Sequence, residues 1–243
     1  SRTRYSSNEG SPGAHQNGLS GILLGADSGN RAWTAWRRRV GRSSADADTG
    51  LDTSHCRFLD SRTPVPQFTV SPENARTVST SIRDHPSAHQ RIAGYLRLQM
   101  RMGGNVIYTD FTDEEGGHGT HVSGSVLGYN QASGCEEALY PMNYQSRAKI
   151  LFMDVERTRS NSSSLMVPSS IYWLMQLSYD SGSRIFTNSW GSSMNAYTFH
   201  AYQIDLFTHL HPTYTVVFSA GNSGPEAGSI GTPATSKNVI AVG

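Results

Sequence analysis

The sequence predicts an α/β protein with a doubly wound, mostly parallel sheet and helices on both faces. Two observations point to this fold class. First, apolar runs typical of strands alternate with segments of helical periodicity, which indicates strands joined by crossover helices in one sheet. Second, loops rich in small and polar residues follow strand-like segments, as expected where the carboxyl ends of parallel strands meet.

Five segments are predicted as strands. Residues 149–155 form a near-continuous apolar run, typical of a strand buried on both faces. Residues 91–98 are predicted as an exposed strand. The other predicted strands are 184–188, 214–218 and 238–242.

Helical patterns lie between these strands. Pro168 opens one helix, whose apolar residues continue to Leu177 and which closes near Gly182. A second helix is predicted up to Leu210, where Pro212 stops it. Residues 116–124 are expected to open a further helix rich in small residues.

Residues 1–45 are predicted as a disordered or linker segment at the N-terminus, and 46–243 as the folded domain. Residues 31–39 interleave Arg and Trp, a pattern that suits nucleic-acid bases or a lipid surface but is more often simply solvated. Residues 40–47 contain one branched apolar residue, a poor composition for a buried central strand. Together, segments 31–39 and 40–47 suggest a reading-frame or splice error within residues 25–48.

Composition excludes several classes of protein. A formal net charge of +1 is too balanced for a chain that as a whole binds nucleic acid or an anionic membrane. No apolar run approaches the ~20 residues needed to span a bilayer. Two cysteines without C-x-x-C spacing make neither a disulfide scaffold nor a zinc site. We therefore expect no nucleic-acid partner and no membrane span, while the oligomeric state is not predicted.

Three loops concentrate the residues that could carry chemistry. They are residues 48–55, 116–124 and 219–224, and they contribute Asp48, His118 and Asn222. An Asp, a His and an Asn on separate loops of one sheet suggest an acyl-transfer site. The Asp would orient the imidazole and stabilise its charged form, and the Asn amide would donate to an oxyanion.

These loops resemble the signature segments of the subtilisin-like serine endopeptidases, in the same order. The D-T-G-L-D-T-S-H segment resembles the family's Asp segment, which implies Asp48 as the catalytic carboxylate. Asp52 is the competitor, because D-T-S-H reads like a copy of the same motif. The G-H-G-T-H-V-S-G segment resembles the His segment, which implies His118 as the general base and His121 as a packed structural histidine.

The resemblance also implies a binding cleft for polypeptides. Ser189, Trp190 and Gly191 resemble the edge strand and one wall of the specificity pocket, and Trp190 suggests a preference for apolar or aromatic side chains. Ala220 and Gly221 resemble the opposite wall, and Asn222 the oxyanion-hole side chain. Thr187 stands where the family usually has Asn. The family's chemistry requires no cofactor, and the family makes secretion or a vesicular lumen plausible.

The nucleophile is missing from the sequence. The family places it in a G-T-S-[MY]-A-x-P segment roughly 65 residues beyond the oxyanion Asn. Ser192 and Ser193 lack this context. We therefore expect the amino-terminal part of a peptidase domain, inert and poorly folded by itself. The alternative is a catalytically inactive relative or a broken gene product that at most binds extended peptides.

Three further interpretations stay open at this point. In the first, His118 and His121 are metal ligands beside the acidic run 113–115 and not parts of a peptidase site. Histidine ligands on a helix, however, more often have H-E-x-x-H spacing. That acidic run is more often a solvated loop, and no ligand spacing supports the calcium that members of the family often bind. Cys56 and Cys135 would pair in an oxidising compartment.

Overall fold

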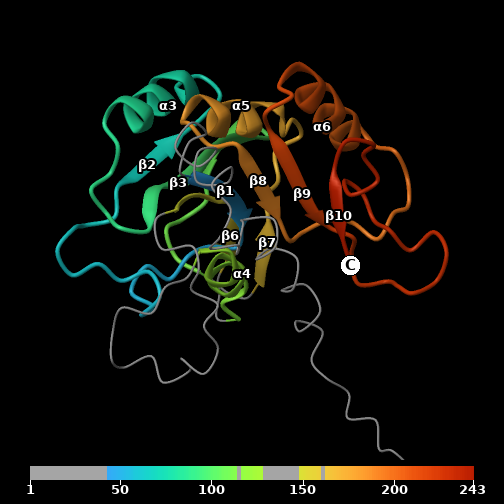
Figure 1. Cartoon of the computed structure of the whole chain (residues 1–243), viewed down its shortest axis with the longest axis horizontal. Helices are drawn as coiled ribbons and strands as arrows, with labels where there is room; N and C mark the ends of the chain where they lie inside the picture. The colour runs from blue at the N-terminus through green and yellow to red at the C-terminus, as the bar shows by residue number, and fades with distance from the viewer. Residues whose placement is uncertain (1–42, 114–115, 128–147, 160–161) are drawn as a thin grey trace, which may run out of the picture.

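The computed structural model describes residues 43–113, 116–127, 148–159 and 162–243 (Figure 1). An eight-stranded sheet has the order β10-β9-β8-β1-β5-β3-β2, with β4 paired to β3. Its strands are β1 (Ser43–Asp48), β2 (Gln67–Val70), β3 (Ile92–Met102), β4 (Asn105–Tyr108), β5 (Lys149–Asp154), β8 (Ile185–Asn188), β9 (Thr215–Ser219) and β10 (Ile240–Val242). A separate antiparallel hairpin joins β6 (Glu156–Arg159) and β7 (Ser162–Leu165).

The sheet is parallel except at β4, which runs antiparallel to β3. Strand β1 lies in the middle, between β5 and β8, and its last residue Asp48 stands opposite Asp154 at the end of β5. Parallel pairing brings the carboxyl ends of β1, β5, β8 and β9 to one edge. The site residues predicted on the following loops therefore meet at this edge.

Helices cover both faces of the sheet (Figure 1). Helices α3 (Ala75–Asp84), α5 (Tyr172–Asp180) and α6 (Phe199–Leu210) lie on one face, and α4 (His118–Leu127) lies on the other. Two buried clusters of apolar side chains correspond to these layers, one containing Leu174 and Phe207 and the other containing Val126 and Phe152. The predicted fold class is confirmed.

Strand β3 corrects one prediction. Ile92, Leu96 and Leu98 are fully buried, whereas the segment was expected to be an exposed strand. The strand lies between β2 and β5 rather than at an edge, and its side chains belong to both buried clusters, Leu96 and Leu98 to one and Ile92 and Tyr95 to the other. Its arginines and glycine obscure this position in the sequence, because they interrupt the apolar run typical of a buried parallel strand.

Strand β1 forms despite its polar sequence. It begins at Ser43, before the predicted domain start at residue 46. Ala45 and Ala47 are fully buried on the face covered by α5 and α6, while Asp46 and Asp48 point to the opposite face, toward α4. Polar composition at 43–48 is thus no obstacle to a central strand. The Arg/Trp run at 31–39 lies outside the described residues, and the hypothesis of a sequence error there stays untested.

Candidate active site

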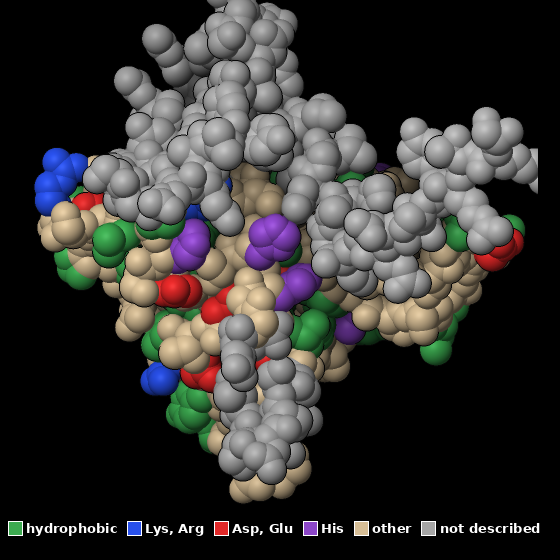
Figure 2. Space-filling view, turned by 90° about the horizontal axis from the view of Figure 1, so that it is seen from below, with side chains coloured by type: hydrophobic (Ala, Val, Ile, Leu, Met, Phe, Trp, Pro, Cys, Tyr) green, Lys and Arg blue, Asp and Glu red, His purple; other side chains and the backbone are tan. Residues whose placement is uncertain are grey.

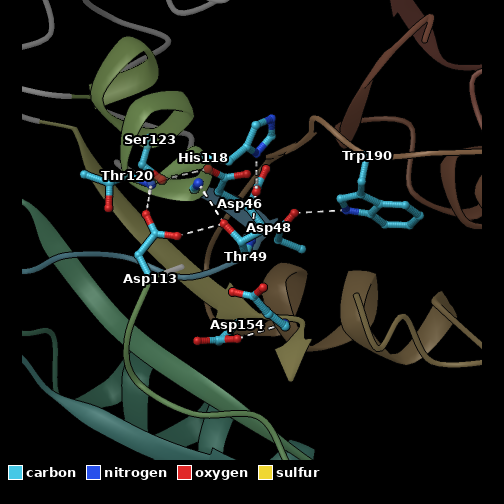
Figure 3. A network of polar contacts seen from close by, with 12 residues as sticks. Asp46, Asp48, Thr49, Asp113, His118, Thr120, Ser123, Asp154 and Trp190 are labelled. Carbon is cyan, nitrogen blue, oxygen red and sulfur yellow. Dashed lines mark hydrogen bonds and ion pairs between the residues drawn. The ribbon is translucent and has the colours of Figure 1, made fainter. Parts of the chain in front are cut away.

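Asp48 and His118 form a hydrogen-bonded pair at the carboxyl edge of the sheet (Figure 3). Asp48 ends β1 and His118 is the first residue of α4, so a strand end and a helix start bring the two side chains together. His118 Nδ1 lies 2.6 Å from Asp48 Oδ1, and the Thr49 backbone N–H donates to the same oxygen over 2.8 Å. The Asp48 side chain is 2% exposed and that of His118 is 41% exposed. A buried carboxylate therefore binds one nitrogen of an imidazole that is itself partly exposed to solvent.

The structure separates Asp48 from its sequence competitor. Asp52 is exposed, and its carboxylate accepts hydrogen bonds from the backbone N–H and the hydroxyl of Ser54, at 2.9 and 2.6 Å. This is a local turn around an Asp side chain, of the kind that short polar residues form with backbone two positions on. Of these two carboxylates, Asp48 is the one that pairs with His118 in the described part of the chain.

His121 differs from the expectation of a packed structural histidine. It is exposed, three residues further along α4 on the solvent side of the helix. Figure 2 shows histidine and acidic side chains gathered on the face of the molecule that carries this helix. Within the described ranges, no group of three or more His, Cys, Asp and Glu side chains is placed to hold a metal ion. Glu114 and Glu115 lie outside those ranges.

Asp113 and Thr49 connect the two loops that carry the pair (Figure 3). The Thr49 hydroxyl donates to Asp113 Oδ1 over 2.8 Å and accepts from the Gly119 backbone N–H over 2.9 Å. Asp113 Oδ2 accepts from the Thr120 backbone N–H over 2.8 Å. The carboxylate thus satisfies a free N–H in the first turn of α4, where negative charge is favourable.

Sequence reasoning missed this role of Asp113, because the acidic run around it was interpreted as a solvated loop. A signal was present, since an Asp shortly before a helix start is a common capping residue. The four residues 114–117, which separate Asp113 from His118 and end in two glycines, obscured it.

Close backbone packing between the two loops requires glycine at two positions. A Cβ atom at Gly119 would lie 2.1 Å from the Gly50 carbonyl oxygen, and one at Gly50 would lie 2.0 Å from the Thr112 carbonyl oxygen. Both are backbone atoms that cannot move aside without shifting a loop. The two glycines therefore bring the start of α4 onto the turn after Asp48.

A cleft of about 540 Å³ opens beside the Asp48–His118 pair. All the predicted site residues line it except Ala220: the lining includes Asp48, His118, Ser189, Trp190, Gly191, Gly221 and Asn222. The backbone of Ala220 is instead bonded to its neighbours, with its N–H on the Val242 carbonyl and its carbonyl accepting from the Gly231 N–H. The cleft brings together residues from the ends of β1, β8 and β9 and from the start of α4.

The side chain of Trp190 packs into the wall of the cleft and is held there by two contacts. Its indole N–H donates to the Ala47 carbonyl oxygen over 3.0 Å, and its ring packs edge-on against Phe218 with centroids 4.9 Å apart. Most of the indole is buried, so it presents little apolar surface to the cleft. Much of the wall around it consists of glycine and serine, including Gly191, Ser192 and Ser193. The preference for aromatic side chains stays a prediction.

Behind the pair, Asp154 and Tyr95 fix the loop that follows Asp48. The Tyr95 hydroxyl donates to Asp154 Oδ2 over 3.1 Å and accepts from the Leu51 backbone N–H over 2.9 Å. Burial raises the pKa of Asp154 to about 9. Burial likewise raises the pKa of Tyr95 above its ordinary value, with the nearby Asp154 as the next cause. Both groups are therefore neutral at physiological pH.

Tyr95→Phe is expected to lower the free energy of unfolding by about 2–4 kcal/mol, because it leaves the buried Leu51 N–H and Asp154 Oδ2 without the Tyr95 hydroxyl, while Asp154 Oδ1 keeps its bond from the Glu156 backbone N–H. Urea unfolding of the two proteins measures the difference. Tyr108→Phe is the matched control, since Tyr108 is exposed and its hydroxyl has no hydrogen bond among the described residues; a change below about 0.5 kcal/mol is expected there. Equal effects of the two substitutions would contradict the role assigned to Tyr95.

Cys56 is disulfide-bonded. Cys135, the partner expected for it, lies outside the described residues. No helix in the described ranges has the length and apolar character needed to cross a membrane.

The family model of the subtilases, a family of serine peptidases, matches residues 45–243. The chain belongs to this family. Among curated proteins, it is 34% identical over 211 residues to the serine protease/ABC transporter B family proteins tagD and tagB of Dictyostelium discoideum, which covers 85% of this chain. It is 28% identical over 202 residues to tagA of the same organism. The chain spans about 10% of the length of these relatives.

Among solved structures, the PatG macrocyclase domain aligns with a TM-score of 0.40 and 12% sequence identity, over 89% of this chain and 62% of the other. The same macrocyclase in complex with peptide aligns with a TM-score of 0.41 and 12% identity, over 89% and 63% of the two chains.

Proposed function

We propose that this chain carries the acid–base half of a serine endopeptidase site, with His118 as the general base, Asp48 as its orienting carboxylate and Asn222 as an oxyanion donor. The observation that supports this most strongly is the Asp48–His118 pair at the mouth of the cleft. Its burial is asymmetric in the way the chemistry requires, since the carboxylate is enclosed and the imidazole is accessible.

In the proposed reaction, His118 Nε2 takes the proton of a serine hydroxyl as the serine oxygen attacks the peptide carbonyl carbon. Asp48 accepts from Nδ1–H, which sets the tautomer and stabilises the imidazolium. The imidazolium then gives its proton to the departing amine, and water hydrolyses the acyl-enzyme by the same proton path in reverse. This chemistry uses protein groups and water alone.

The position of Asn222 supports its proposed role as an oxyanion donor. It lies three residues beyond the end of β9 and lines the same cleft as His118. A side-chain amide at such a position contributes roughly 3–4 kcal/mol to stabilising the tetrahedral intermediate.

An extended polypeptide is the proposed substrate. Strand β8 lies between β9 and β1, so the segment 189–191 is not an edge strand as the sequence suggested. These residues follow β8 beyond its last residue and line the cleft, and we propose that their backbone pairs with a peptide laid along them. Main-chain pairing of this kind binds peptides largely independently of sequence, and pockets add the preference. The Gly and Ser wall beside Trp190 then determines which side chains fit.

The proposal requires a nucleophile from chain outside these 243 residues, because none of their serines stands in a G-T-S-x-A-x-P segment. The test therefore uses the natural protein with that segment included. We expect it to hydrolyse unstructured polypeptides, and His118→Ala to lower kcat by about 10⁴-fold or more.

His121→Ala is the matched control, since this exposed histidine lies on the same helix and outside the cleft lining. It should leave kcat within about twofold. Peptide binding without any cleavage by the wild-type protein would overturn the peptidase proposal and favour the inactive peptide-binding alternative.

A further inference from the structure

A second carboxyl group lies beneath the Asp48–His118 pair. Asp46 is two residues before Asp48 on β1, so both side chains lie on the face of the sheet that α4 covers. Asp46 is completely buried, and the Ser123 hydroxyl donates to its Oδ2 over 2.8 Å (Figure 3). Its Oδ1 is buried without a hydrogen-bond partner.

Among the described residues, no Lys or Arg forms a salt bridge with Asp46, and His118 is the neighbouring group that can carry a positive charge. The titratable groups that face it are Asp48 on its own strand and His118 on α4, with Asp154 next to Asp48 on β5. Its neighbours in register, Phe152 on β5 and Thr187 on β8, are uncharged. Arg57 approaches α4 at Gly124, and no salt bridge joins it to Asp46 among the described residues.

A buried, half-bonded carboxylate next to a second carboxylate is costly, and the neutral acid costs less because it carries no charge to desolvate. Burial, and next the Asp48 charge, raise the pKa of Asp46 well above its ordinary value, and the Ser123 hydrogen bond and His118 lower it by less. The geometry and the charges thus agree on a group that keeps its proton.

Helix α4 is held to β1 at two points through these residues. His118, at its first residue, binds Asp48, and Ser123, five residues later, binds Asp46. Five residues correspond to about 7.5 Å along a helix. Two anchors at this separation fix both the position and the rotation of α4, and therefore the direction of the imidazole.

We propose that Asp46 is a positioning residue of the site: a neutral carboxylic acid that binds Ser123, holds α4 on β1 and so fixes His118 against Asp48. This inference rests on the proposed function only in that His118 is the general base. The acid form also keeps a second negative charge away from the pair.

Asp46→Asn tests the charge state, because the amide is neutral and its oxygen still accepts from Ser123. In the protein that includes its serine segment, we expect kcat and KM within about twofold of wild type and an unchanged midpoint on the acid side of the kcat/KM profile. If Asp46 were ionised, its removal would lower the pKa of His118 and move that midpoint to lower pH. Such a shift would overturn the proposal.

Asp46→Leu tests the positioning role, since it removes the bond to Ser123. We expect kcat to fall by about 10- to 100-fold with KM nearly unchanged, because a small displacement of the base affects proton transfer rather than binding. Ser123→Ala removes the same bond with a smaller change of volume and should act in the same direction. Full activity of both variants would contradict the positioning role.

Two measurements are independent of activity and separate a failure of this inference from a failure of the proposed function. The first is urea unfolding of wild type and Asp46→Asn at several pH values. A carboxyl whose folded pKa is raised destabilises the fold increasingly as pH rises from about 4 toward that pKa. The stability advantage of Asp46→Asn should therefore grow as pH rises above about 4, and an advantage that stays constant would show that Asp46 is ionised throughout.

The second is the proton NMR signal of His118 Nδ1–H. Its downfield position should persist in Asp46→Asn and move or disappear in Ser123→Ala. Persistence of an unshifted signal in Ser123→Ala would show that Ser123 and Asp46 do not position the imidazole.

Discussion

Asp48→Asn is expected to lower kcat for peptide hydrolysis by about 10⁴-fold in the protein that includes its nucleophilic serine. Asp48 Oδ1 accepts from both His118 Nδ1 and the Thr49 N–H. An amide that keeps its oxygen there lacks the charge that stabilises the imidazolium. An amide that turns its NH2 group toward Nδ1 holds the wrong tautomer of His118. Either orientation impairs His118 as a base while leaving the cleft in place, so KM should change little.

Asp52→Asn is the matched control for this prediction. Asp52 occurs in a copy of the same D-T motif, but it is exposed, and within the described ranges its side chain is bonded to Ser54 alone. Its replacement should leave kcat within about twofold. A large loss in Asp52→Asn together with a small loss in Asp48→Asn would reverse the assignment of the catalytic carboxylate.

Gly119→Ala is expected to destabilise the fold by about 3 kcal/mol or more, because the new Cβ would lie 2.1 Å from the Gly50 carbonyl oxygen. The contact is between backbone segments, so relief requires α4 to move away from the turn after Asp48. That movement lengthens the His118–Asp48 hydrogen bond, and kcat should fall together with the midpoint of thermal unfolding.

Gly124→Ala, on the same helix, supplies the comparison. A Cβ there would lie 3.7 Å from the Arg57 Cδ, an ordinary van der Waals contact. Alanine also favours the helix over glycine by up to about 1 kcal/mol, so this variant should be as stable as wild type or slightly more stable. Urea unfolding of the two variants measures the contrast, and a Gly124→Ala protein as unstable as Gly119→Ala would show that close backbone approach is not the cause.

The elements that could be predicted from the sequence are those with uninterrupted apolar patterns. Strands β5, β8 and β9 and helices α5 and α6 lie where apolar runs or periodicity indicated them. Strand β2, helix α3 and the β6–β7 hairpin were not predicted. The first has four residues, α3 buries only Ser79 and Ile82, and β7 is mostly serine, so none has a strong pattern of its own.

In the site, the residues that belong to sequence motifs could be predicted, and those that act through distant partners could not. Asp48 and His118 belong to contiguous motifs, and the structure brings them within hydrogen-bonding distance. Asp113 and Asp46 act through Thr120 and Ser123, partners 7 and 77 residues away. Asp46 was moreover interpreted as evidence against a buried strand. Its partner on α4 explains why the strand tolerates it, and only the packing of the helix on the sheet reveals that partner.

In the proposed function, the Asp48–His118 pair activates a serine nucleophile. The most direct test is labelling by a fluorophosphonate of the natural protein with its serine segment, with the modified residue located by mass spectrometry. We predict a single modified serine, in a G-T-S-x-A-x-P segment, and labelling that is abolished in His118→Ala and retained in His121→Ala. Modification of Ser192 or Ser193, or labelling that proceeds equally well without His118, would contradict the claim.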